Sequence, residues 1–283
     1  MERKPSIAIV GPGRLGTALA LALHDAGYEV SGIVTHASKS SGRNAEHLAQ
    51  QVDAKVVKTL SAISFDLAWL CVPDSQIANA ARTLAIQVEW EGKVALHSSG
   101  VLTSDELDAL RSRGAAVASV HPLMTFVSRS YPSVAGVSFA IEGDAAAVRA
   151  ARRVVRQLRG KSYAIAKRDK PAYHAWCTFA SPLVTALLAT SDEVAALAGV
   201  GNRAAARRMT PILLQTIQNY AALGPAAGFS GPFIRGDADT VQAHLKVLRK
   251  APDAKNVYVA LARSALKFLP GKNKRDLKKA LKA

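Results

Sequence analysis

A glycine-rich turn between an apolar run and an Ala/Leu-rich segment constrains this chain more than any other feature. Residues 6–10 are predicted to form a buried strand and residues 14–26 a helix. The turn between them has G-x-G-x-x-G spacing, with Gly11, Gly13 and Gly16. At a strand-to-helix junction this motif indicates a dinucleotide site, because the first N–H groups of the helix can hold a diphosphate. The alternative is an ordinary glycine-rich turn.

The three glycines have distinct predicted roles. Gly11 would make the tight turn, Gly13 would let the backbone approach a pyrophosphate, and Gly16 would let the helix pack closely on the strand. We therefore assign the whole segment to cofactor binding: Gly11, Pro12, Gly13, Arg14, Leu15 and Gly16.

The order of the apolar segments predicts an α/β fold. Strands and helices alternate over residues 1–160, which predicts a Rossmann-type doubly wound parallel sheet with helices on both faces. The expected strands are 6–10, 28–34, 54–58, 66–72, 93–97, 115–120 and 137–141, and the expected helices are 14–26, 42–51, 75–86, 104–113 and 144–159. Residues 161–283 add a short strand, 162–165, and then helices at 170–198, 202–222, 238–250, 254–268 and 272–282. This second part is predicted as an all-helical domain for substrate binding and dimerisation.

The segment after the second strand indicates which coenzyme fits. NAD sites place a carboxylate on the ribose about 20 residues beyond the glycines. Here no carboxylate occurs between that strand and Glu46. The segment instead supplies hydroxyl, imidazole and cationic groups: Thr35, His36, Ser38, Lys39 and Arg43. A 2′-phosphate needs such donors, so we predict NADP rather than NAD. The alternative is a solvated loop and helix turn.

Polar side chains follow the later strands, at the edge where ligands bind in doubly wound sheets. Val72, Pro73 and Asp74 would line the cofactor, although Asp74 could instead cap the next helix. In the next two connections, His97, Ser98 and His121 would approach the nicotinamide, with each His as a donor or general acid and Ser98 also beside the cofactor. The alternative for each His is a hydrogen bond to the loop backbone.

The helical part contributes further candidates for the substrate site. His174 lies near the start of a long apolar helix, and Arg235 and Asp237 belong to residues 231–237, predicted as a rigid loop. A buried Arg on such a loop suits a carboxylate-bearing substrate, because its guanidinium binds carboxylates through two hydrogen bonds. The alternatives are a buried, satisfied ring for His174, a surface ion pair for Arg235 and a helix cap for Asp237.

The helix expected at residues 170–198 is apolar nearly all round. Such a helix is predicted to be buried on every side. Because the domain is small, some of these sides would face a partner subunit, which predicts a homodimer through the helical domain.

Composition limits the remaining classes of function. The net charge is +16, and residues 241–283 carry 12 Lys or Arg but only two acids. We interpret this segment as the solvated face of amphipathic helices, and the alternative is contact with nucleic acid or an anionic membrane. No metal-ligand spacing, signal-peptide core or membrane-spanning run occurs, and Cys71 and Cys177 form no C-x-x-C pair. We therefore predict a cytoplasmic protein without metal.

Taken together, these motifs resemble those of an uncharacterised family of predicted NADP-dependent oxidoreductases, with a Rossmann-like domain and a C-terminal helical domain of unknown function. The resemblance covers nearly the whole chain. It rests on Gly11-x-Gly13-x-x-Gly16, Val72-Pro73-Asp74, His97-Ser98-Ser99-Gly100, His121-Pro122-Leu123-x-Thr125-Phe126, Tyr173-His174 and Gly231-Pro232-x-x-Arg235-Gly236-Asp237. More distantly the chain is similar to ketopantoate reductase, pyrroline-5-carboxylate reductase and 6-phosphogluconate dehydrogenase. These relatives imply hydride transfer to or from a small carbonyl or imine, in a cleft between the two domains. The role expected for Arg235 makes an anionic metabolite the predicted substrate.

The sequence departs from these relatives at the first long helix of the second domain. The distant reductases use a Lys or another donor there, whereas we expect this stretch to offer His174 and Ser181 and no Lys. Family members often read Ala-Ser-Asn where this chain has Ala180-Ser181-Pro182, and Pro182 is predicted to kink the helix. A non-catalytic, NADP-binding regulatory protein is therefore the alternative to an enzyme.

Overall fold

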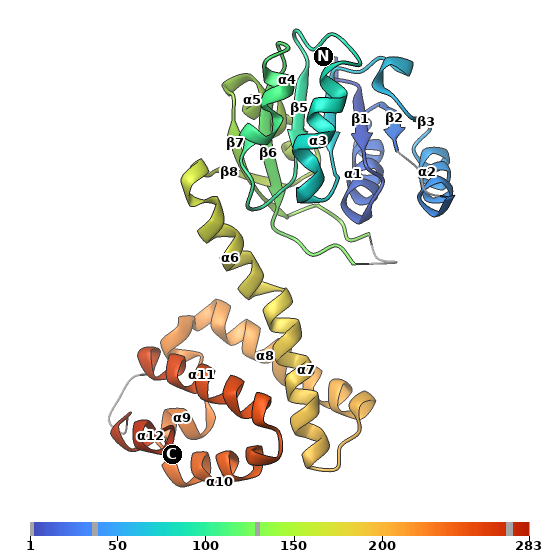
Figure 1. Ribbon diagram of the computed structural model, residues 1–283. Coiled ribbons are helices and arrows are strands. Elements are labelled where there is room, and N and C mark those ends of the chain that lie inside the picture. Colours follow the sequence, from blue (N-terminus) through green and yellow to red (C-terminus); the bar gives the residue numbers. More distant parts are fainter. Residues whose placement is uncertain (1–2, 36–38, 128–130, 270–273, 283) are drawn as a thin grey trace. The chain divides into compact units, whose positions relative to one another are not determined.

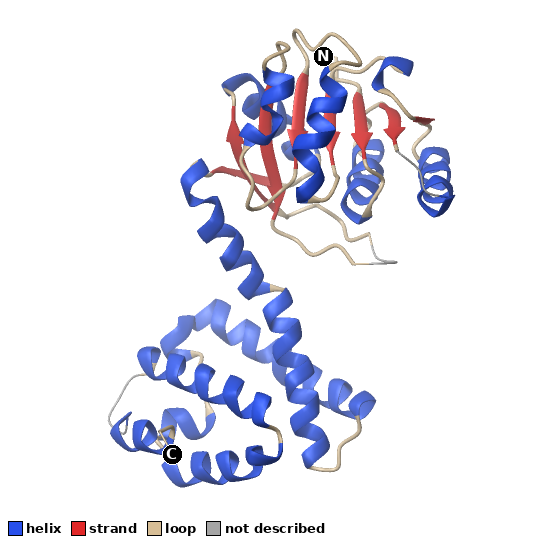
Figure 2. Cartoon of the chain, in the orientation of Figure 1, coloured by secondary structure: helices blue, strands red, loops and turns tan. Residues whose placement is uncertain are grey.

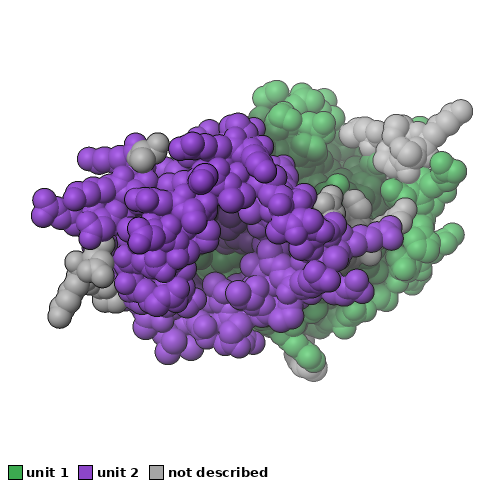
Figure 3. Space-filling model, turned by 90° about the horizontal axis from the view of Figure 1, so that it is seen from below, with its two compact units in different colours: residues 1–178 green, residues 179–283 purple. Residues whose placement is uncertain are grey.

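The computed structural model describes residues 3–35, 39–127, 131–269 and 274–282, without the side chains of residues 39–41 and Asn202. The chain divides into two compact units, Met1–Thr178 and Phe179–Ala283 (Figure 3). The division falls within helix α6 (Lys170–Ala180), beyond the boundary at residue 160 that the sequence suggested.

The first unit is built on an eight-stranded sheet (Figure 1). Its strands are β1 (Ile7–Val10), β2 (Val30–Val34), β3 (Lys55–Val57), β4 (Leu67–Leu70), β5 (Val94–His97), β6 (Ala116–Pro122), β7 (Ser138–Gly143) and β8 (Lys161–Ala164). Each overlaps a strand predicted from the sequence. The spatial order is β3-β2-β1-β4-β5-β6-β7-β8, so the chain reverses its direction of travel across the sheet between β1 and β4. Ligands of doubly wound sheets bind at such a point.

The prediction of a wholly parallel sheet is wrong at one edge. Strands β1 to β6 are parallel, but β7 runs antiparallel to β6, with Val120 opposite Ile141, and β8 is parallel to β7. A parallel neighbour needs a crossover connection, usually a helix. The described residues between β6 and β7 contain no helix, so the chain turns back directly beside β6.

Helices cover both faces of the sheet, because successive strand residues point to opposite sides. Ile7 and Ile9 pack with α1 (Arg14–Asp25), α2 (Lys39–Gln51) and α5 (Ala145–Gln157). Ala8 and Val10 pack on the other face with α3 (Asp74–Ala85), the 3-10 turn η2 (Ser104–Leu107) and α4 (Asp108–Arg111). Three more 3-10 turns are η1 (Leu60–Ala62), η3 (Lys167–Asp169) and η4 (Leu248–Lys250). The predicted doubly wound architecture is confirmed.

The described part of the second unit is helical (Figure 2). Its helices are α7 (Pro182–Leu197), α8 (Asn202–Ala227), α9 (Gly231–Arg235), α10 (Ala238–Val247), α11 (Pro252–Phe268) and α12 (Lys274–Ala280). The predicted interruption at Pro182 occurs, since α6 ends at Ala180 and α7 begins with the proline. A proline has no N–H and is tolerated in the first turn of a helix.

Two expectations for the second unit are wrong. The segment predicted as a rigid loop at residues 231–237 contains the short helix α9, which ends at Gly236 in a left-handed conformation. The long apolar helix is not buried within the chain: α7 has no buried residue, and Leu183, Val184 and Leu187 are exposed. The small core of this unit lies instead between α10, α11 and α12.

Candidate functional site

The glycine turn has the geometry that the motif requires. Gly11 has φ +96°, and a Cβ there would lie 3.0 Å from the Cys71 carbonyl oxygen after β4. A Cβ on Gly16 would overlap the Gly11 carbonyl oxygen. Gly13 precedes α1, and its nearest neighbour would be 3.9 Å away. The turn therefore needs glycine at 11 and 16, and at Gly13 it leaves open space beside the start of α1.

The start of α1 supplies backbone donors beside this space. The helix begins at Arg14, and Thr17 N donates the hydrogen bond to Gly13 O, 2.8 Å away. The first N–H groups of a helix have no partner within it, so those of Arg14, Leu15 and Gly16 point out of its N-terminus. Pro12 has no N–H, and the Arg14 side chain is exposed. These residues fit a diphosphate.

The segment after β2 is described only in part. Thr35 is buried, and its N–H donates to Val57 O at 3.1 Å. Arg43 is exposed on α2. His36, Ser38 and the Lys39 side chain lie outside the described residues, so their contacts with a 2′-phosphate stay predictions.

The connection after β4 lies against the glycine turn. A Cβ on Gly11 would also meet Val72 Cγ1 at 3.0 Å. Pro73 is the N-cap of α3, and Asp74 is its first residue. The suggested capping role of Asp74 is wrong, because the Asp74 carboxylate makes no capping bond and accepts a hydrogen bond from Ser99 Oγ at 2.7 Å.

Ser99 connects several elements at the carboxyl edge of the sheet, just beyond β5. Besides its bond to Asp74, Ser99 Oγ accepts from Leu102 N at 2.9 Å. The neighbouring Ser98 Oγ accepts from the Trp69 indole nitrogen at 2.8 Å, which ties the loop to β4. The conformation of the loop that follows β5 is therefore fixed by side chains from neighbouring elements.

Lys170, the first residue of α6, holds the same loop from the other side. The Lys170 side chain is fully buried, and its Nζ donates to Ser99 O at 3.1 Å and to Ser119 Oγ at 2.7 Å. Burial lowers the pKa of Lys170 to about 8, against the opposing effect of the Glu142 and Asp74 carboxylates. A buried amine with such a pKa, at a sheet edge that binds ligands, is typical of a functional site.

The expectation that this helix offers no Lys is wrong. Lys170 was missed because it is the first residue of the helix, followed by Pro171, where a cation is ordinarily solvated. Nothing in the sequence pairs it with Ser99, in the loop after β5, or with Ser119, within β6.

His97 is a buried structural residue. Ser99 N–H donates to its Nδ1 at 3.1 Å, so Nε2 carries the proton and donates to Thr103 O at 2.9 Å. Burial lowers the pKa of His97 to about 4. The geometry corrects the predicted role of His97 beside the nicotinamide and supports the alternative, a ring satisfied by the loop backbone.

His121 and His174, predicted independently, come together beside this loop. Their ring centroids are 5.9 Å apart in an edge-to-face arrangement, and His121 Nδ1 is 2.7 Å from Tyr173 Oη. Both imidazoles are half-buried. Burial, reinforced by His174 and Lys170, lowers the pKa of His121 to about 4, so this ring is neutral at pH 7. The pair can offer hydrogen bonds to a ligand.

Arg235 and Asp237 belong to the second unit, and the expectation of a buried Arg is wrong. The Arg235 side chain is 64% exposed at the end of α9, 4.0 Å from the Asp237 carboxylate. Asp237 caps α10, accepting from Thr240 N at 3.1 Å and Thr240 Oγ1 at 2.7 Å. These bonds also lower the pKa of Asp237. The geometry agrees with the alternatives of an ion pair and a helix cap.

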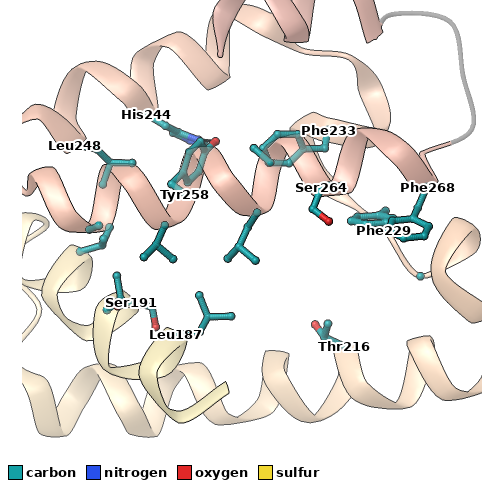
Figure 4. Close-up of a pocket in the computed structure, with 18 of the residues that line it drawn as sticks. Leu187, Ser191, Thr216, Phe229, Phe233, His244, Leu248, Tyr258, Ser264 and Phe268 are labelled. Carbon is teal, nitrogen blue, oxygen red and sulfur yellow. Dashed lines mark hydrogen bonds between the residues drawn. The ribbon is translucent and has the colours of Figure 1, made fainter. Parts of the chain in front are cut away.

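The second unit contains an apolar cavity of about 940 Å³ (Figure 4). Phe229, Phe233 and Phe268 line it together with aliphatic side chains of α7 and α11. Its polar groups are few; the His244 ring, 3.0 Å from the Tyr258 hydroxyl, is one of them. Such a surface suits an apolar occupant rather than a charged metabolite.

The described ranges contain neither a candidate metal site nor a candidate membrane-spanning helix. No group of three or more metal-ligating side chains occurs there. None of the helices has the length and apolar content that a membrane-spanning helix requires. Cys71 and Cys177 are both free and half-buried.

Family models match both parts of the chain. The Rossmann-like domain matches residues 2–122, and the domain of unknown function DUF2520 matches residues 137–265. The chain therefore combines a Rossmann-like domain with a DUF2520 domain, as the resemblance in the sequence predicted. No curated protein has significant sequence similarity to it.

Solved structures with the same fold cover nearly the whole chain. An inferred NADP oxidoreductase from Bacteroides fragilis is 20% identical, with a TM-score of 0.77 over 93% of this chain and 98% of its own. A reductive aminase from Aspergillus terreus, in complex with NADPH and ethyl-5-oxohexanoate, is 17% identical, with a TM-score of 0.67 over 94% of each chain. A pyrroline-5-carboxylate reductase from Coxiella burnetii is 12% identical, with a TM-score of 0.62 over 93% of this chain and 99% of its own. The predicted distant relationship to pyrroline-5-carboxylate reductase is confirmed at the level of the fold.

Proposed function

We propose that this protein is an NADP-dependent oxidoreductase that transfers a hydride between nicotinamide and a small anionic carbonyl or imine metabolite. One observation carries the proposal. The glycine turn follows β1, and Lys170, His121 and His174 gather beside the loop after β5 and the end of β6, at the same carboxyl edge of one sheet. In the strand order β1-β4-β5-β6, two strands separate the turn from His121. A dinucleotide that begins at the turn would reach toward this group.

The residues of the turn fit the coenzyme. Gly11 and Gly16 shape the turn, and the N–H groups at the start of α1 would bind the diphosphate. Val72, Pro73 and Ser98 would line the rest of the coenzyme. When bound, NADPH supplies a hydride to an electrophilic carbon. The absence of a carboxylate between Thr35 and Glu46 supports NADP over NAD.

The side chains at the edge have different parts in this proposal. Lys170 touches no open space, so it acts as a positioning residue that fixes the Ser99 carbonyl and places a positive charge behind the site. That charge stabilises negative charge that develops on a carbonyl oxygen. His121 and His174, which are half-buried, would donate hydrogen bonds to the substrate.

A turnover screen tests the proposal. NADPH consumption would be followed with keto acids, aldehydes and cyclic imines, using wild type and His121→Ala. We expect turnover of at least one class and a loss of about 100- to 1000-fold in kcat for the variant, as for removal of a donor to a developing oxyanion. NADPH binding without turnover of any class would contradict an enzyme and support the regulatory alternative, which the Pro182 interruption and the structural use of His97 favour.

We propose further that the helical unit mediates a homodimer. Leu183 and Val184 on α7 and Ile212, Ile217 and Leu223 on α8 are exposed apolar side chains. The apolar cavity beside them lacks the polar groups that a charged ligand needs. Exposed apolar surface of this extent marks an interaction surface. Light scattering at micromolar concentration should give twice the chain mass, and a monomer would contradict the proposal.

A further inference from the structure

The Tyr173 hydroxyl lies in hydrogen-bond contact with one nitrogen of the His121 ring. Tyr173 Oη lies 2.7 Å from His121 Nδ1, and the rings meet edge-to-face with centroids 5.4 Å apart. Tyr173 is only 9% exposed. Burial raises the pKa of Tyr173, so its hydroxyl keeps its proton. A buried hydroxyl gives its proton to the best acceptor in reach, and a neutral imidazole nitrogen is a good one.

This hydrogen bond fixes the tautomer of His121. When Nδ1 accepts from Tyr173, the ring proton must be on Nε2, because a neutral imidazole carries one N–H. The second proton is disfavoured by burial and by the cationic or titratable groups that face the ring: His174 and Lys170 from α6, and His97 from β5. His121 is therefore a neutral ring with one defined donor.

The Nε2–H group faces the loop after β5. A Cβ on Gly100 would lie 2.9 Å from His121 Nε2 and would also overlap the His174 ring. Glycine at this position leaves the nitrogen unobstructed, and within the described ranges no residue accepts a hydrogen bond from it. The donor is therefore available to a ligand.

We propose that Tyr173 is a positioning residue that holds His121 as the Nε2–H tautomer, so that Nε2–H beside Gly100 donates a hydrogen bond to the substrate. The hydrogen bond to the substrate rests on the proposed function, whereas the tautomer of His121 does not. Such a donor needs a free lone pair on the group that reacts, and a carbonyl oxygen or an unprotonated imine nitrogen has one. An iminium ion has no free lone pair for it.

Nitrogen-15 NMR of the imidazole rings, recorded on the full chain without ligand, tests the positioning. In wild type at pH 7 we expect a single Nε2–H pattern for His121, assigned by its loss in His121→Gln. In Tyr173→Phe we expect a mixture of the two tautomers. Tyr258→Phe is the matched control, because it removes the same kind of Tyr–His contact at another ring, that of His244 with Nδ1 3.0 Å from the Tyr258 hydroxyl, and it is judged on the His121 signals. It should keep the wild-type pattern.

The outcomes separate this inference from the proposed function. An Nδ1–H pattern in wild type, or an unchanged single pattern in Tyr173→Phe, would overturn the inference whatever the activity. If the pattern is as expected, Tyr173→Phe should also lower kcat roughly tenfold with the KM for NADPH unchanged. His121→Gln, which keeps an N–H donor, should retain more activity than His121→Ala. Absence of all turnover would contradict the oxidoreductase while the tautomer result still supports the positioning.

Discussion

The two units differ in how they bury their apolar side chains. In the first unit, apolar clusters cover both faces of the sheet, and its large side chains, such as Trp69, Trp90 and Phe139, are completely buried. In the second, the core is small, and this unit holds fourteen of the twenty large hydrophobic side chains that are exposed within the described ranges.

The two units therefore differ in what covers their apolar side chains. The first unit buries its own apolar side chains, and hydrogen bonds within it hold His97, Ser99 and Lys170 at the carboxyl edge, so its candidate site is formed before any ligand binds. The second unit has apolar helices that a single chain leaves uncovered, and exposed patches of this kind indicate an interaction surface. The comparison predicts that changes in the first unit affect binding and pH dependence, whereas changes on α7 and α8 affect assembly.

The largest expected effect concerns His97, deep in the first unit. Its pKa of about 4 when folded lies below the unfolded value near 6.5. Between these values the unfolded chain binds the proton and the folded chain does not, so stability falls as pH drops from about 6.5 to 4, by on the order of 3 kcal/mol. Urea unfolding at both pH values measures this loss, which His97→Asn should reduce. His47 is exposed, and His47→Asn should show the same loss of stability as wild type. An equal loss in wild type, His97→Asn and His47→Asn would contradict the assignment of this loss to His97.

Gly16→Ala tests whether the first unit is preformed for a dinucleotide. The new Cβ overlaps the Gly11 carbonyl oxygen, so the turn must shift. We expect NADPH affinity to fall roughly 100-fold, about 2.7 kcal/mol, in calorimetric titration. Gly201→Ala is the control, because nothing lies within 4 Å of its Cβ position and the residue has an ordinary φ of −69°. Unchanged affinity in Gly16→Ala would show that the turn does not bind the coenzyme.

Ile217→Asp tests the exposed surface of the second unit. Ile217 is 62% exposed on α8, and we expect a charge there to weaken the proposed dimer at least tenfold, because it would be buried on assembly. Ile86, 77% exposed beside α3, receives the same substitution as the control and should leave assembly unchanged. Sedimentation velocity over a range of concentrations measures both. Equal behaviour of the two variants would remove the contrast between the units.

The smallest expected effect is the pH dependence due to Lys170. If the protonated amine supports the site, kcat should be constant below about pH 8 and decline above it, because the pKa of Lys170 is lowered to about 8. The groups that face Lys170 are Glu142, Asp74, His97 and His121, and none adds a positive charge at this pH. Lys170→Met should have low activity without this decline, whereas Lys167→Met, at an exposed ion pair with Asp105, should keep it. If kcat still declines above about pH 8 in Lys170→Met, the decline is due to another group.

Local patterns in the sequence predicted most of the fold. All eight strands follow from short apolar runs, and the glycine turn follows from the spacing of Gly11, Gly13 and Gly16. The direction of β7 was not predicted, because direction depends on the connection after β6 and not on the strand itself. The exposure of α7 was not predicted either. An apolar sequence indicates that a helix will be buried, but not whether the same chain or a partner subunit buries it.

The candidate site was predictable only in part. Pro73, Asp74, His97 and His121 were found because strand ends in a parallel sheet meet at one edge. Their roles depend on partners distant in the sequence: Asp74 on Ser99, and His121 on Tyr173, 52 residues away. Lys170 was missed for the same reason. Its partners, Ser99 and Ser119, lie 71 and 51 residues away in the sequence.

The central claim is that the turn at residues 11–16 is shaped for the diphosphate of NADP. Calorimetric titration of the full chain with NADPH and with NADH tests it most directly. We predict one site per chain for NADPH and at least tenfold weaker binding of NADH, with the NADPH signal strongly reduced in Gly16→Ala. The absence of heat with both coenzymes, or an NADPH signal in Gly16→Ala equal to that of wild type, would contradict the account.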